Sequence, residues 1–117
     1  MNKNAAIAMA FELKGTDMNF PHDHFTMSYG QSRDYGIDYR DFEKVTRLPE
    51  GVPLMALAGV WGDYSDIRCL FIDADGNCYR RHISGRAGEY IIRELGLNAK
   101  DLKVGEMVIS GAQPRHP

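Results

Sequence analysis

Two histidines at alternate positions are the first residues of this chain that could bind a metal ion. His22 and His24 flank Asp23 and precede an alternating run with Phe25 and Tyr29 on its apolar side. In an extended strand, residues two apart lie on one face about 7 Å from each other, which permits one metal ion between two imidazoles. Catalytic zinc uses three protein ligands and structural zinc four, so the pair is only part of a site. His22 and His24 are therefore metal candidates, and we favour the alternative of two solvent-facing histidines.

A second alternating group combines a thiol with basic side chains. Cys78, Arg80 and His82 share one face if residues 78–83 form a strand. A neighbouring guanidinium and imidazole can lower the pKa of a thiol and turn it into a nucleophile. The chain contains no Gly-x-Ser-x-Gly motif, no phosphate-binding glycine loop and no Cys-x-x-Cys motif to support catalysis. We therefore assign no catalytic residue and no cofactor, and an enzyme using Cys78, His22 or His24 is the alternative to a non-enzymatic protein.

The third group is a basic cluster next to a predicted helix start. Its members could bind an anion such as phosphate, a carboxylate or a nucleic-acid backbone: Arg80, Arg81, His82, Ser84 and Arg86. Proteins that bind nucleic acid usually carry a basic overall balance, whereas this chain has a net charge of −2 and a pI near 6.0. Ion pairs between these arginines and Glu89, Glu94 or acidic loops are the alternative that we favour. Anion or nucleic-acid binding is thus the third functional class.

A β-hairpin over Ile67 to Ile83 positions the second and third groups. Two β-prone runs flank the turn residues Asp73-Ala74-Asp75-Gly76-Asn77. Two registers are possible. A type I turn with a bulge at Gly76 pairs Phe71 with Tyr79 and gathers more apolar surface than a two-residue turn does. We therefore expect the bulged register.

Length and composition predict one domain. A chain of 117 residues with 44% hydrophobic content can bury a core, and we expect a single domain over residues 1–112 with a frayed tail over 113–117. The longest apolar run, 52–61, is far shorter than the roughly 20 residues that cross a bilayer, so no membrane is expected. Cys69 and Cys78 point to opposite faces of the predicted hairpin, so we expect no disulfide and a cytoplasmic location.

The remaining periodicity predicts an α+β fold: a mostly antiparallel sheet of five or six strands with one main helix, about residues 85–96, packed on one face. Ser84 can cap that helix and Gly96 can end it. Alternation predicts a strand over 4–14, and continuous apolar character predicts a buried central strand over 53–61. The pattern also predicts a short helix that Asp38 caps and Pro49 ends, and a last short strand over 104–109.

Two surfaces suggest contacts between proteins. Ala6, Ala8 and Ala10 form a flat face of the strand predicted over 4–14, and a second subunit could pack closely on it. Tyr35 and Tyr39 lie in an aromatic and acidic stretch of the type that anchors interfaces. We therefore expect a non-enzymatic binding or accessory protein that contacts another protein or itself as a homodimer, with nucleic acid disfavoured as a partner.

The incomplete ligand set leads to a testable prediction. Because His22 and His24 supply only two ligands, the purified and dialysed protein should carry less than one metal ion per chain. Elemental analysis measures this. One tightly held zinc, iron or nickel ion per chain would instead make His22 and His24 site residues and favour the enzyme.

Overall fold

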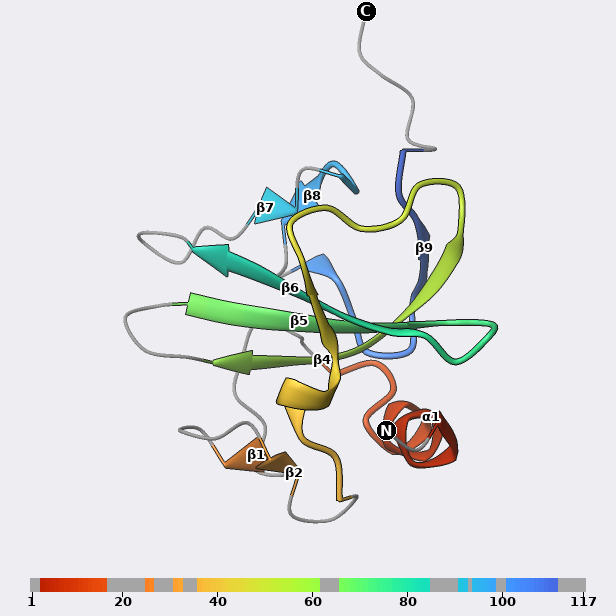
Figure 1. Ribbon diagram of the computed structural model, residues 1–117, viewed down its shortest axis with the longest axis vertical. Helices are drawn as coiled ribbons and strands as arrows, with labels where there is room; N and C mark the ends of the chain where they lie inside the picture. Colours follow the sequence, from red (N-terminus) through yellow and green to blue (C-terminus); the bar gives the residue numbers. More distant parts are fainter. Residues whose placement is uncertain are drawn as a thin grey trace, which may run out of the picture.

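The computed structural model describes residues 3–16, 25–26, 31–32, 36–61, 66–84, 91–92, 94–98 and 101–111. A five-stranded sheet forms its centre (Figure 1). In spatial order the strands are β3 (Glu43–Val45), β6 (Cys78–Ser84), β5 (Asp66–Asp73), β4 (Pro53–Trp61) and β9 (Met107–Ile109). All neighbours are antiparallel except β3 and β6, which are parallel. With one α-helix, α1 (Lys3–Glu12), this confirms the predicted α+β class.

The central hairpin has the bulged register that the sequence predicts. Phe71 pairs with Tyr79 and Ile67 with Ile83. Gly76 has a φ of 89°, a left-handed conformation that glycine adopts without steric cost. Asp73 holds the turn together. Its Oδ1 accepts from the main-chain N–H groups of Asp75 and Asn77 at 3.0 and 2.8 Å, and its Oδ2 accepts from Asn77 Nδ2 and the Tyr79 hydroxyl at 3.0 and 3.3 Å.

Strand β5 is buried on both faces. Cys69 and Phe71 point to one face, and Leu70 and Ile72 to the other. All four are almost fully buried. The register also places Cys69 and Cys78 on opposite faces, and both thiols are free, as expected. A strand that is apolar on both faces needs a covering layer on each side.

Helix α1 supplies part of one layer, and the prediction of a strand over 4–14 is wrong. Ala6, Met9, Ala10 and Leu13 are buried at helical spacing. The alternation of large and small residues misled the prediction because alanine fits both periods. Four alanines between residues 3 and 12 favour a helix, since alanine has the highest helix propensity and is depleted in strands.

The main helix predicted over about 85–96 is also wrong where the structure describes it. Strands β7 (Ile91–Ile92) and β8 (Leu97–Asn98) form a small antiparallel hairpin instead. Its turn contains Gly96 at a φ of 66°, so the glycine that was expected to end a helix reverses a hairpin. The two adjacent β-branched isoleucines fit a strand better than a helix. In Figure 1, α1 and this hairpin lie on opposite sides of β4, β5 and β6.

The chain between Asp38 and Pro49 contains less helix than predicted. Asp38 does cap a helix start, because its Oδ1 accepts from the Arg40 N–H at 2.9 Å, but only one 3-10 turn, η1 (Tyr39–Asp41), follows. Residues 43–45 then join the sheet as β3, parallel to β6. Pairing with the edge of a formed sheet satisfies more main-chain groups than a second helical turn would.

The strands predicted over 53–61 and near the end of the chain are present. Residues 53–61 form the central strand β4, paired with β5 and β9 and interrupted by a bulge between Ala56 and Ala58. The last strand is shorter than predicted, with only residues 107–109 in β9. A separate short hairpin joins β1 (Phe25–Thr26) to β2 (Gln31–Ser32). The predicted tail, 113–117, lies outside the described residues. No helix of the described segments has the length and apolar character to cross a membrane.

The Asp73 network allows a test of the hairpin. Replacing Asp73 by Ala removes its side-chain hydrogen bonds and leaves the turn N–H groups to water, so the free energy of unfolding should fall by about 2 kcal/mol. Urea denaturation followed by circular dichroism measures this change. Asp75→Ala is the matched control, because Asp75 is an exposed acid of the same turn, and its effect should stay within about 0.5 kcal/mol. Equal effects of the two substitutions would contradict the role of Asp73.

Candidate functional site

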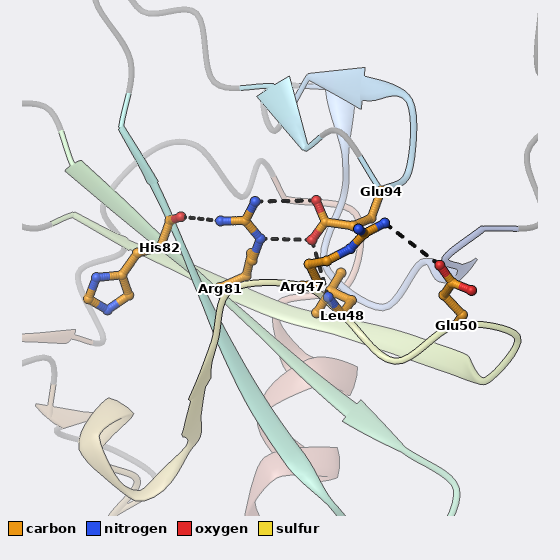
Figure 2. Close-up of polar contacts among 6 residues, drawn as sticks. All are labelled: Arg47, Leu48, Glu50, Arg81, His82 and Glu94. Atoms are coloured by element: carbon orange, nitrogen blue, oxygen red, sulfur yellow. Dashed lines mark hydrogen bonds and ion pairs between the residues drawn. The ribbon is translucent and has the colours of Figure 1, made fainter.

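A buried ion pair joins three distant segments on one side of the sheet. Arg81 of β6 contacts Glu94, in the turn after β7, through Nε–Oε2 at 2.8 Å and Nη2–Oε1 at 3.2 Å (Figure 2). Glu94 Oε2 also accepts from the main-chain N–H of Leu48 at 3.2 Å. The side chains of Arg81 and Glu94 are 20% and 6% exposed. The pair therefore ties β6, the β7–β8 hairpin and the segment before β4 together.

The electrostatics of Glu94 follow from these contacts. Burial alone acts to raise the pKa of the Glu94 carboxyl, but the hydrogen bonds from Arg81 and Leu48 and the charge of Arg81 outweigh it. The pKa of Glu94 is therefore lower than usual, and the carboxylate is ionised at neutral pH. An ionised, two-point contact of this kind is a structural pair rather than a proton donor or acceptor.

This geometry divides the basic cluster predicted from the sequence. Arg81 faces the side of the sheet that carries Cys69, because the two residues pair across β5 and β6. Arg80 and His82 point to the opposite side, and Figure 2 shows the His82 imidazole directed away from Glu94. Pairing of Arg81 with Glu94 was one of the alternatives expected from the sequence. Ser84 is the last residue of β6, and Arg86 lies outside the described residues.

Arg80 and His82 contact each other on their own side. Arg80 Nη1 lies 3.2 Å from His82 Nε2. A guanidinium can only donate, so this hydrogen bond requires a neutral imidazole that accepts at Nε2. Arg68 pairs with His82, and Lys44 with Arg80, so both share this face. The structure thus keeps two residues of the predicted cluster together and adds Arg68 and Lys44, which the predicted cluster did not include.

The two thiols do not have the surroundings of a nucleophile. Burial raises the pKa of Cys69 to about 12. Burial also raises the pKa of Cys78, and the carboxylate of Asp73 acts in the same direction. Both groups are therefore protonated at neutral pH, whereas a nucleophilic cysteine has a lowered pKa.

The metal candidates His22 and His24 lie outside the described residues, and the described residues contain no cluster of three or more metal-ligating side chains. Among the interface candidates, Tyr35 also lies outside them, and Tyr39 begins η1. Ala6 and Ala10 are buried against the sheet and Ala8 is exposed on α1. The flat alanine face of a strand is therefore not present, and the residues proposed for it mainly form core.

An apolar surface that the sequence analysis missed lies elsewhere, and we call it the edge patch. It consists of Phe11, Met107 and Ile109, the large hydrophobic side chains of the described residues that are exposed, at 72%, 58% and 37%. Phe11 belongs to α1, and Met107 and Ile109 to the edge strand β9. In the strand predicted over 4–14, with Ala6, Ala8 and Ala10 on the outer face, Phe11 would lie on the opposite, buried side. The exposed position of Phe11 follows only from the helical conformation.

Main-chain contacts hold the two parts of the edge patch together. Gly15 N–H donates to the Val104 carbonyl, and Val104 N–H donates to the Thr16 carbonyl, both at 3.0 Å. These bonds fasten the end of α1 to the chain just before β9. Two hollows of about 290 and 210 Å³ lie beside Met55 and Met107, which line both, and Phe11 lines the smaller one. Phe11 and Met107 of the edge patch therefore border the same hollow, and Ile109 follows two residues after Met107 on β9.

The Arg81–Glu94 pair allows a second test. Glu94→Gln leaves the Arg81 charge without its partner in a mostly buried place, so the free energy of unfolding at pH 7 should fall by about 3 kcal/mol. The pair formed by Arg47 and Glu50 is the control, because it is exposed and 3.7 Å long, and Arg47→Ala should change the stability by less than about 1 kcal/mol.

The dependence of the stability on pH follows from the lowered pKa of Glu94. The contribution of Glu94 is fully present above the pKa of the unfolded chain, about 4.3, and is lost as the pH falls through the lower pKa of the folded state. Urea denaturation between pH 7 and pH 3 should therefore show a smaller acid loss for Glu94→Gln than for the wild type. Parallel curves for the two proteins would contradict this.

Comparison of the chain with models of protein families, with curated proteins and with solved structures found no match.

Proposed function

We propose that this chain is a non-enzymatic binding protein that acts through contacts with protein, and that the edge patch is its contact surface. The single observation that carries the proposal is that Phe11 of α1 and Met107 of β9 are exposed beside one hollow, with exposed Ile109 two residues further along β9. Aromatic residues and methionine are enriched in the cores of protein interfaces.

The free energy of removing apolar side chains from water supports a contact at the edge patch. Burying a side chain of this size is worth about 1.5–3 kcal/mol relative to leaving it in water. Three such side chains, grouped on one surface next to an open strand edge, are a known origin of protein contacts and of aggregation. A partner that covers the edge patch would gain the part of this free energy that belongs to the exposed fractions of the three side chains, which is why we place the contact there.

The alternative functions receive less support from the geometry. The raised pKa of Cys78 argues against an enzyme that uses this thiol as its nucleophile. The ion pair with Glu94 neutralises Arg81, which removes one member of the proposed anion site. An enzyme and an anion-binding protein remain the second and third candidates; for the third, the basic residues that remain together are Arg80 and His82 with Lys44 and Arg68.

A cytoplasmic location belongs to the same proposal. It is supported by the two free thiols, Cys69 and Cys78, which a reducing compartment would keep reduced.

A binding experiment tests the contact surface. We would immobilise the wild type and Met107→Lys and compare the proteins that each retains from an extract of the source cells. A charge in the centre of the edge patch should reduce retention of at least one protein, this chain included, by about tenfold or more, which corresponds to about 1.4 kcal/mol.

Thr46→Lys is the matched control for that experiment. Thr46 is exposed and directly follows β3, the opposite edge strand, so this variant should retain what the wild type retains. Circular dichroism checks that all three proteins are folded. If Met107→Lys binds the same proteins as the wild type, the edge patch is not the contact surface.

A further inference from the structure

We infer that a second copy of this chain covers the edge patch by antiparallel pairing of its own β9 with β9. The inference depends on the proposed function and names the partner. The two edges of the sheet differ in the side chains that they carry. The outer strand β3 carries the exposed charges of Glu43 and Lys44, whereas β9 carries exposed Met107 and Ile109 and no charge. Charged side chains protect an edge against pairing, and β9 lacks this protection.

The main-chain groups of β9 point the right way for pairing. Ala56 N–H donates to the Glu106 carbonyl and Gly51 N–H to the Ser110 carbonyl, each at 2.9 Å, so the carbonyls of residues 106 and 110 point to β4 and to the segment just before it. In an antiparallel ladder, alternate residues bond to opposite sides. The main-chain N–H and carbonyl groups of Met107 and Ile109 therefore point outward, along the sheet edge of the described structure.

The residues of β9 are complementary to themselves about a two-fold axis through Val108. This axis pairs Met107 with Ile109 of the partner subunit, and the reverse pair follows by symmetry. Each such pair can exchange two main-chain hydrogen bonds, and both side chains lie on the face that carries Phe11. Glu106 then lies opposite Ser110 of the partner subunit, so no like charges oppose each other within 106–110. An isologous contact of this kind is the usual form of a homodimer.

The size of the surface decides how stable the dimer is. The exposed parts of Phe11, Met107 and Ile109 together amount to roughly 300 Å² per subunit, against about 800 Å² per partner in a standard stable interface. A contact of this size, with a three-residue strand, gives a weak and reversible dimer. We therefore expect the population of dimer to rise with concentration from the micromolar to the millimolar range.

A mixed-cysteine experiment tests the register. Two differently tagged proteins, Met107→Cys and Ile109→Cys, are prepared in a Cys78→Ser background and oxidised separately and as a mixture. Opposite residues of a hydrogen-bonded antiparallel pair have Cα atoms about 5.5 Å apart, within the range of a disulfide. The mixture should form a disulfide-linked heterodimer several times faster than either protein alone forms a homodimer. Both positions are exposed, so the fold should tolerate the substitutions, and circular dichroism verifies it.

The remaining outcomes overturn the inference. Equal crosslinking in the mixture and in the separate proteins would show random collisions or another register. No crosslinking at millimolar concentration would show that β9 does not pair with itself.

Light scattering over the same concentrations provides the second readout. The mass of the wild type and of Thr46→Lys should rise from 13.2 kDa toward twice that value, and Met107→Lys should remain a monomer. A monomeric wild type overturns the second copy as the partner. If Met107→Lys then still loses a different protein from the extract, the proposed function stands; if it loses none, both proposals fail.

Discussion

The structure depends on one constraint, which is that strand β5 is apolar on both faces. Leu70 and Ile72 on one side and Cys69 and Phe71 on the other are almost completely removed from water. A sheet with one wet face would leave two of these side chains exposed, at a cost of several kcal/mol. The chain before β5 and the chain after it must therefore each cover one face. Helix α1 and the β7–β8 hairpin lie on opposite sides of β4, β5 and β6 accordingly (Figure 1).

The second layer is held by charge as well as by apolar contacts. Short hairpins such as β7–β8 bury little surface of their own and are marginal without support. The bond of Glu94 with Arg81 supplies that support, and the Leu48 N–H adds a third segment to it (Figure 2). Taking both charges out of water has a desolvation cost, so the pair contributes more to the choice of one arrangement than to overall stability. The ion pair also explains why the central hairpin carries a basic residue, Arg81, on a buried face.

The two edge strands of the sheet carry different kinds of side chain, and this difference links the fold to the proposed function. One edge ends in the charged side chains of β3, and the other in the apolar side chains of β9 beside Phe11. Helix α1 covers the middle of the sheet on one side. This cover ends near β9, where Val104 forms main-chain hydrogen bonds with Gly15 and Thr16, just after α1. The exposed parts of Phe11, Met107 and Ile109 add nothing to the core, which is the physical basis for assigning them to a partner.

The sequence alone determines the parts of the fold that depend on local turn chemistry and continuous apolar character. These are the hairpin with its bulge at Gly76, the central strand β4, and the opposite orientation of Cys69 and Cys78. The periodicity does not determine the state of the alanine-rich start or of Ile91 and Ile92, because each pattern fits both a helix and a strand; residue propensity and tertiary packing together separate the two. The ion pair of Arg81 with Glu94 was one alternative among several, because the sequence does not show which acidic residue the fold brings to Arg81. The edge patch could not be predicted at all, since the exposure of Phe11 and Met107 depends on where α1 ends relative to β9, and that distance is set by contacts between residues about ninety positions apart in the chain.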